Sequence, residues 1–180
     1  MSKENFNLIS LVNHSGCFDL QFRKDTRHER TGSPTYYRWK LQFVITAKKD
    51  HMAILERAQK ELDCGTVGVI KEQARFSVQD IDTIVDVIIP HFTEHKLSEN
   101  PPSHKASAGQ SKKKDFELWQ KAAAIIYKNK GKAIGKWEKN DLLQLIEIHS
   151  QMMKYKEKPR KQKWAEMAET IAKQPTKNEA

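Results

Sequence analysis

Several features of membrane, secreted and disulfide-bonded proteins are scarce or missing in this chain of 180 residues. Its two cysteines, Cys17 and Cys64, form neither a CxxC pair nor a disulfide framework, so we expect two reduced thiols. No apolar run approaches the roughly 20 residues that a membrane-spanning helix needs. The first 16 residues lack the ordered basic, apolar and small-residue regions of a secretory signal. We therefore expect no membrane partner.

Motifs of several enzyme classes are missing as well, including a P-loop, a dinucleotide fingerprint and a Ser/His/Asp pattern. His91 and His95 have the i,i+4 spacing of a metal-binding pair on a helix. Because no cysteine or acid accompanies them in a known ligand pattern, we expect them to be surface histidines. The motifs alone predict no metal site and no cofactor.

Charge is abundant and unevenly distributed. Residues 1–100 hold 14 Lys or Arg and 14 Asp or Glu, whereas residues 101–180 hold 18 basic and 9 acidic residues. The second segment therefore carries the whole formal net charge of +9. Such asymmetry is typical of a protein with a polyanionic partner. Nucleic acid is favoured over anionic lipid, because the segment lacks one amphipathic helix with a wide apolar face.

Hydrophobic periodicity predicts an α+β domain with a helical extension. The clearest signal is the alternation of apolar and polar residues over 35–46, which predicts a half-buried strand. The expected elements are helices over 5–13, 50–63 with Asp50 as N-cap, 78–90, 115–127, 140–155 and 163–173, and strands over 17–24, 35–46, 66–70 and 74–78. We divide the chain into an αββαββα core over 1–98, a linker over 99–113, helices that complete the domain over 114–158, and a basic helical tail over 159–180.

Five segments, taken together with their order and spacing, carry a resemblance to a known family. They are 8–16, 17–24, 41–50, 92–97 and 114–123, and the first reads Leu-Ile-Ser-Leu-Val-Asn-His-Ser-Gly. The chain resembles the LAGLIDADG homing endonucleases, as a member with a single signature segment. The resemblance implies a LAGLIDADG-type saddle with additional C-terminal helices. In that fold the sheet lies over a nucleic-acid duplex, and two signature helices pack side by side.

The signature segment differs from the family pattern where metal chemistry depends on it. In the family, the residue before the final glycine is an acid that holds a divalent cation, and here it is Ser15. Asn13 replaces another acid, and Ala47 stands where the family has a water-orienting polar residue, whereas Lys96 matches a retained basic residue. A serine hydroxyl cannot supply the charge that Mg²⁺ takes from carboxylates. The resemblance thus implies an inactive nuclease without catalytic residues or metal, with Asp19 as the nearest remaining acid.

The predicted nucleic-acid-binding surface combines the polar faces of the strands with basic C-terminal runs. Arg and Gln suit bidentate contacts with base edges, and Lys and Arg suit phosphates. The residues predicted on the strands and their loops are Gln21, Arg23, Arg27, Arg30, Arg38, Lys40, Gln42, Lys71, Gln73 and Arg75. Those predicted in the C-terminal part are Lys112, Lys113, Lys114, Lys128, Lys130, Lys132 and Lys136. A solvated sheet face and a solvated lysine-rich surface are the alternatives.

These observations predict a catalytically inactive, LAGLIDADG-derived protein that binds structured RNA, which the lysine-rich C-terminal part favours over DNA. The resemblance implies an organelle, mitochondrion before chloroplast, with ribosomal RNA and a ribosomal particle as partners. Two alternatives stay open: an active homodimeric DNA endonuclease, which would need Mg²⁺, and a group I intron maturase. A homodimer through the helix over 8–16 and a monomer bound to RNA are both open.

Overall fold

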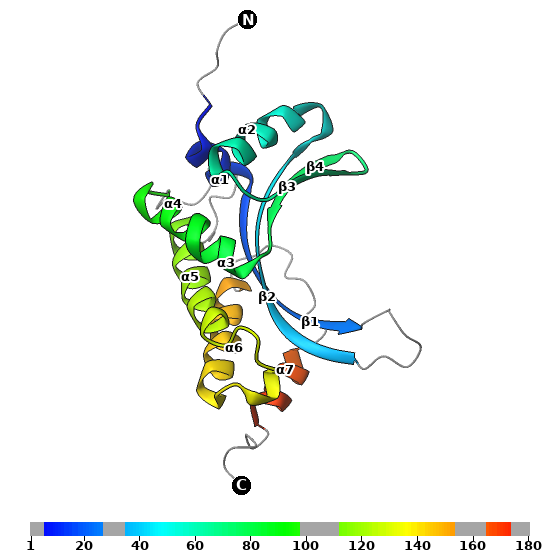
Figure 1. Cartoon of the computed structure of the whole chain (residues 1–180), viewed down its shortest axis with the longest axis vertical. Coiled ribbons are helices and arrows are strands. Elements are labelled where there is room, and N and C mark those ends of the chain that lie inside the picture. The colour runs from blue at the N-terminus through cyan, green and yellow to red at the C-terminus, as the bar shows by residue number, and fades with distance from the viewer. Residues whose placement is uncertain (1–5, 27–34, 98–111, 154–164, 174–180) are drawn as a thin grey trace, which may run out of the picture.

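A computed structural model describes residues 6–26, 35–97, 112–153 and 165–173. These residues form one four-stranded antiparallel sheet with the strand order β1-β2-β4-β3. Figure 1 shows the helices gathered along one side of the curved sheet, and none of the described helices covers its other side. The α+β class and the saddle-like sheet predicted from the sequence are confirmed.

The elements follow one another in the predicted order. The first half contains α1 (Leu8–Ser15), β1 (Gly16–Thr26), β2 (Thr35–Lys48), the short 3-10 turn η1 (Lys49–His51), α2 (Met52–Leu62), β3 (Thr66–Ile70) and β4 (Gln73–Val78). A helical stretch follows as α3 (Ile81–Thr83), the π-helical turn η2 (Ile84–Ile88) and α4 (Ile89–Glu94). The last part contains α5 (Lys112–Lys128), the 3-10 turn η4 (Ile134–Lys136), α6 (Lys139–Met153) and α7 (Ala165–Lys173). None of the described helices is both long and apolar enough to cross a membrane.

Helix α1 passes directly into strand β1, and this junction requires a glycine. The helix begins after Asn7, whose Oδ1 accepts a hydrogen bond from the backbone N–H of Ser10 at 2.8 Å. At the other end, a Cβ on Gly16 would lie 2.6 Å from the carbonyl oxygen of Val12. Because a real Cβ does not approach another atom so closely, the strand can start at this point only if the residue has no side chain.

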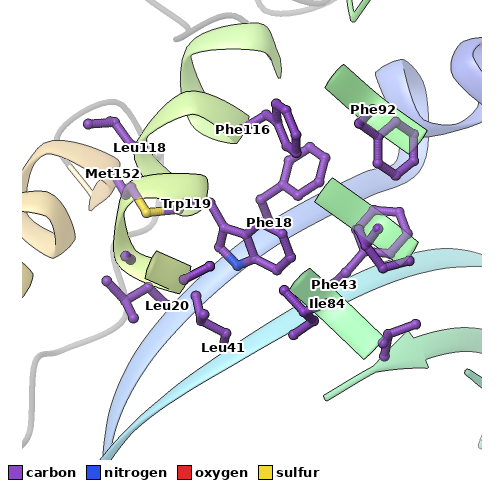
Figure 2. Packing of buried hydrophobic residues seen from close by; sticks show 14 of the residues in the cluster. Phe18, Leu20, Leu41, Phe43, Ile84, Phe92, Phe116, Leu118, Trp119 and Met152 are labelled. Atoms are coloured by element: carbon purple, nitrogen blue, oxygen red, sulfur yellow. The ribbon is translucent and has the colours of Figure 1, made fainter. Parts of the chain in front are cut away.

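An aromatic cluster fills the space between the sheet and the helices, as Figure 2 shows. The ring of Phe18 in β1 lies at its centre, with centroid distances of 5.2 Å to Phe43 of β2 and to Phe116 and Trp119 of α5. Phe92 of α4 approaches the same ring at 5.7 Å. Aromatic pairs of this kind contribute about 0.5–1.5 kcal/mol each beyond the burial of their surface. Helix α5 is therefore packed into the same core as the sheet.

Several helix boundaries differ from the sequence-based prediction. Asp50, predicted as an N-cap, lies inside η1, and α2 begins without a side-chain cap. The cap that the sequence analysis missed is Asp80, whose Oδ2 accepts a hydrogen bond from the backbone N–H of Thr83 at 2.9 Å. The helix predicted to end at Pro90 continues through α4. The π-helical turn ends at Ile88, and Pro90 lies in the first turn of α4. A proline has no N–H to donate, and in the first turn of an α-helix this donor is not needed.

The predicted domain boundaries stay predictions, because residues 98–111 and 154–164 lie outside the described part of the chain. Helix α5 begins at Lys112, inside the predicted linker. At the other end, α7 packs against α6, and its Ala168 and Ala172 are buried in the common core. The described C-terminal helices therefore belong to the same packed unit as the sheet.

Candidate nucleic-acid interface

The outer sheet face is the side of the sheet that points away from the helices. Strand alternation buries Phe18 and Leu20 of β1 in the core and turns their neighbours to the opposite side. The pairing register then assigns the residues of the other strands. The outer sheet face carries Cys17, Asp19, Gln21, Arg23 and Asp25 of β1, Tyr36, Arg38, Lys40, Gln42, Val44, Thr46 and Lys48 of β2, Gln73, Arg75 and Ser77 of β4, and Thr66, Gly68 and Ile70 of β3.

Most residues predicted to bind nucleic acid from the strands are brought together on this face. They are Gln21, Arg23, Arg38, Lys40, Gln42, Gln73 and Arg75. Lys71 lies instead in the turn between β3 and β4, with a left-handed φ of 57°. Arg27 and Arg30 lie outside the described residues. Contact of any of these side chains with nucleic acid stays a prediction.

Three cations are crowded together on the outer sheet face. Arg23 and Arg38 lie directly opposite each other, and Lys40 is the next residue of β2 on the same face. Burial, together with the charges of Arg23 and Arg38, lowers the pKa of Lys40 from its usual value, and the nearby Asp25 offsets only part of this effect. Like charges placed opposite each other destabilise a sheet. An anionic ligand at this place would remove the repulsion.

Two carboxylates lie beside these cations, and each contacts a polar side chain of the same face. The Oδ2 of Asp25 forms an ion pair with Nε of Arg38. The Oδ2 of Asp19 accepts a hydrogen bond from the Nε2 amide of Gln21. Both contacts favour one direction for a long side chain on the outer sheet face.

The half of the outer sheet face that β3 and β4 form is less charged. Arg75 lies there opposite Thr46 on one side and Gly68 on the other. Its Nε is buried and has no hydrogen-bond partner among the described residues. A Cβ added to Gly68 would meet no atom within 4 Å, so the space beside Arg75 is open. This half therefore offers one arginine with an unsatisfied donor and room for a ligand.

The junction of α1 and β1 does not gather the ligands of a divalent cation. Helix α1 ends at Ser15, and with Asn13 before it the helix end carries no carboxylate. Asp19 lies along β1 opposite Gln42, and its carboxylate contacts Gln21. No group of three His, Cys, Asp or Glu residues in the described part of the chain could hold a metal ion. Because Mg²⁺ requires hard carboxylate ligands, the residues present do not fit the metal site that the family implies.

Ala47, which stands where the family has a water-orienting polar residue, faces away from the α1–β1 junction. Ala47 pairs with Ala74 on the core side of the sheet and packs against the hydrophobic cluster. Its neighbours Thr46 and Lys48 are the polar residues on the outer sheet face at this end of β2. The family match of Ala47 stays a prediction. Lys96, the retained basic residue, is exposed just after α4.

Two of the predicted C-terminal lysines have partners within the protein. Nζ of Lys128 lies 3.1 Å from the carboxylates of Glu138 and Asp141, and hydrogen bonds to these acids raise the pKa of Lys128. Lys130 forms an ion pair with Asp82, which joins the turn after α5 to α3. Lys130 and Asp82 are far apart in the sequence, so the pairing could not be read from the basic run. These ion pairs offset part of the positive charge of both lysines, and their contact with nucleic acid stays a prediction.

The other predicted lysines lie at two places on the surface. Lys112 donates a hydrogen bond to the carbonyl oxygen of Gly16 and so ties the start of α5 to the α1–β1 junction. Lys113 and Lys114 follow it in the first turn of α5, and Lys132 and Lys136 are exposed in the turn between α5 and α6. Their contact with nucleic acid stays a prediction.

A groove connects the outer sheet face with the turn between α5 and α6. Strand β4 pairs with β2 only over 43–48, so over 35–42 that edge of β2 has no strand beside it in the described chain. A cavity of about 820 Å³ follows this edge, and its lining includes Tyr36, Lys40, Lys132 and Trp137. Lys40 of β2 and Lys132 of the turn between α5 and α6 therefore line the same groove.

The sequence of this chain matches that of a known family and a known protein. The profile of the family described as LAGLIDADG endonuclease matches residues 11–123. A probable intron-encoded DNA endonuclease 1 of Mycosarcoma maydis is 29% identical over 105 residues, which are 54% of this chain and 35% of that protein. The chain thus spans about a third of the length of this curated relative.

Solved structures share the fold. The homing endonuclease I-TnaI superposes with a TM-score of 0.63 at 16% identity, over 91% of this chain and 95% of that chain. The LAGLIDADG homing endonuclease I-LtrWI, solved with its target DNA, superposes with a TM-score of 0.63 at 24% identity, over 84% of this chain and 46% of that chain. This chain therefore corresponds to about half of I-LtrWI. The chain belongs to the LAGLIDADG endonuclease family, as a domain with a single signature helix.

Proposed function

We propose that this protein binds duplex DNA on its outer sheet face, as a LAGLIDADG-type recognition unit that does not cleave the DNA. The observation that carries the proposal is the crowding of Arg23, Arg38 and Lys40 on that face. Duplex DNA presents one negative charge per about 1.7 Å of its axis, so it supplies the anion density that would neutralise this cluster. The complex of I-LtrWI with its target DNA supports DNA as the ligand.

The dimensions of the long hairpin fit a duplex. Strand β2 has 14 residues. At about 3.3 Å per residue this is roughly 46 Å, the length of roughly 13 stacked base pairs. Its outward side chains recur roughly every 6.7 Å, so a row of them can follow the base edges along the major groove. A two-stranded ribbon is one of the shapes that this groove accepts.

A complete saddle would need a second unit of the same kind. The chain covers 95% of I-TnaI but 46% of I-LtrWI, and a second copy is the unit that we propose for the other half of the saddle. Helix α1 is the surface through which the resemblance joins two units, and its Ile9 and Leu11 are only half-buried in the single chain. We therefore expect a homodimer on a DNA target that is longer than one hairpin covers.

Cleavage is left out of the proposal because of the chemistry at the end of α1. Ser15 supplies a neutral hydroxyl where a metal-dependent nuclease needs a carboxylate. Asp19 lies on the outer sheet face with its carboxylate directed to Gln21. The second candidate is an active endonuclease, which the relative from Mycosarcoma maydis favours. That candidate predicts Mg²⁺-dependent cutting of a specific duplex.

Binding and cleavage can be separated in one set of experiments. The full chain is titrated into labelled duplex DNA from a randomised pool, with and without Mg²⁺, and both the bound fraction and the strand lengths are measured. We expect salt-sensitive binding and intact strands. The double variant Arg38→Ala/Lys40→Ala should bind more weakly, with a salt slope reduced by about one for each lost phosphate contact.

The matched control removes two exposed lysines from the helices, Lys60 of α2 and Lys121 of α5. Lys60→Ala/Lys121→Ala lowers the net charge by the same amount but leaves the outer sheet face intact. If both double variants lose equal affinity, binding is a bulk charge effect and the proposed surface is wrong. Cut strands that require Mg²⁺ would establish the endonuclease instead.

The same titration tests the sequence-based prediction that the protein binds RNA in preference to DNA. That prediction depended on the lysine-rich C-terminal part, in which Lys128 and Lys130 are engaged in ion pairs. Structured ribosomal or intron RNA enters the same assay as a competitor. Tighter binding of such RNA than of duplex DNA would favour the ribosome-associated or maturase role. An organellar location and a ribosomal particle as partner stay predictions, and fractionation of the cell of origin tests both.

A further inference from the structure

Carboxylates are unexpected on a surface that contacts phosphates, yet the outer sheet face carries two beside its cations. Asp19 and Asp25 both belong to β1. Each contacts a side chain that can read a base edge: Asp19 holds Gln21, and Asp25 holds Arg38. We propose that the two acids are positioning residues, which aim Gln21 at an adenine and Arg38 at a guanine in the bound DNA. This inference depends on the proposed function.

The contact with Asp19 fixes the orientation of the Gln21 amide. A carboxylate only accepts hydrogen bonds, so Nε2 must face Asp19, and the reverse orientation would place two acceptors together. One N–H of the amide is used in this contact, which leaves the carbonyl oxygen and the second N–H for a ligand. An acceptor beside a donor is the pattern that complements N6 and N7 of adenine in the major groove.

The contact with Asp25 gives Arg38 a direction that its neighbours would otherwise oppose. Arg38 lies opposite Arg23 and beside Lys40, so without a counter-charge its guanidinium would turn away from both. The ion pair engages Nε. Among the described residues no contact occupies either terminal nitrogen of Arg38. Two parallel donors are the pattern that complements O6 and N7 of guanine.

The register of the hairpin sets the spacing of the two bases. Gln21 lies opposite Lys40, and Arg38 is two residues away from Lys40 along β2. Two strand residues span roughly 6.7 Å, whereas successive bases on one strand are separated by about 3.4 Å. The adenine and the guanine should therefore be about two base pairs apart, with the guanine nearer the end of the hairpin where Thr26 pairs with Thr35.

Selection from a randomised duplex DNA library with the full-length chain measures this preference at every position. In the aligned sequences selected by the wild type, we expect one position enriched in adenine (the adenine column) and one enriched in guanine (the guanine column), about two positions apart. Gln21→Ala should flatten only the adenine column, and Arg38→Ala only the guanine column. The exposed-lysine variant Lys60→Ala should leave both columns unchanged.

The Asp25 variants separate positioning from simple support of the fold. Asp25→Asn should lower the preference for guanine by roughly tenfold, within the range of one bidentate contact. At the same time it should raise affinity for unrelated duplex, because one repulsive charge is removed. Asp25→Glu should restore much of the preference, since it keeps the carboxylate. Asp19→Asn should lower the adenine preference in the same way, because its amide no longer dictates the orientation of Gln21.

Three results would overturn this inference. The first is duplex binding by the wild type with neither column present. The second is a guanine column that persists in Arg38→Ala. The third is an Asp25→Asn variant whose affinity falls for all sequences alike. In these cases DNA binding itself stands, whereas failure of the wild type to bind any duplex would reject the proposed function as well.

Discussion

The buried Asp141 near the start of α6 offers a direct test of how the turn between α5 and α6 is held. Asp141 as a whole residue is 5% exposed, and Asn129 is 2% exposed. Nδ2 of Asn129 donates hydrogen bonds to Asp141 at 2.7 Å and to the carbonyl oxygen of Ile125 at 3.0 Å. Lys128 completes the network from the surface. We predict that Asp141→Ala is among the more destabilising single substitutions in the chain.

The magnitude follows from the groups that lose a partner. A buried amide N–H left without an acceptor costs about 1–3 kcal/mol. An acid in the first turn of a helix contributes about 0.3–1 kcal/mol through the helix dipole. Asp141→Ala should therefore lower the free energy of unfolding by roughly 3 kcal/mol, which is about 6–12 °C in melting temperature for a chain of this size. Asp141→Asn keeps an acceptor and should lose less.

Urea and thermal unfolding monitored by circular dichroism measure both quantities. The control is Glu138→Gln, which removes the other acid beside Lys128 but at a side chain that is 69% exposed. An exposed pair contributes about 0–1 kcal/mol, so this variant should unfold almost as the wild type does. Equal losses for Asp141→Ala and Glu138→Gln would refute the reasoning, because burial would then not matter.

Three further predictions concern other parts of the molecule. Burial and the neighbouring His95 lower the pKa of His91. The free energy of unfolding should therefore fall as the pH drops from about 6.5 through the lower folded-state pKa, because the unfolded chain binds the proton first. Urea titrations at about pH 5–8 measure this fall, and His91→Gln should flatten it. Gly16→Ala should lower the free energy of unfolding by about 2 kcal/mol or more, because its Cβ would meet the backbone of Val12; Gly68→Ala, which meets no atom, is the control in thermal melts. Ser15→Asp should make DNA binding tighten with Mg²⁺, whereas the wild type and Ser15→Asn should not respond; a response of the wild type would contradict the assignment of this junction.

The sheet could be predicted from the sequence because each strand obeys a local rule. Strict alternation over 35–46 marked β2, and the structure extends this strand only to Lys48. The face of each residue followed from the same alternation, which is why Arg23, Arg38 and Lys40 were expected on one surface before their register was known. The strand pattern therefore predicted both the layer and its polar side.

The sequence-based predictions failed where the structure depends on a contact between residues that the sequence pattern does not link. Asp80 caps a helix that begins at Ile81, three residues after the start that the apolar pattern predicts. The ion pair of Lys130 with Asp82 joins two segments that only the folded chain brings together. The contacts of Asp19 and Asp25 with their neighbours were also beyond the sequence, since alternation gives the face of a side chain but not its partner.

The pairing of β2 divides the hairpin into a stiff and a compliant part. Over 43–45 the strand is held on both edges, by β1 and by β4, whereas the described chain holds it by β1 alone over 35–42 and by β4 alone over 46–48. Two-stranded ribbons twist more readily than wider sheets. On the core side, the ring of Trp39 rests against His149 of α6 with a centroid distance of 5.7 Å, which gives the ribbon a pivot. The wide centre would then fix the alignment of the protein on a duplex, while the outer ribbon adapts to local variation in groove width.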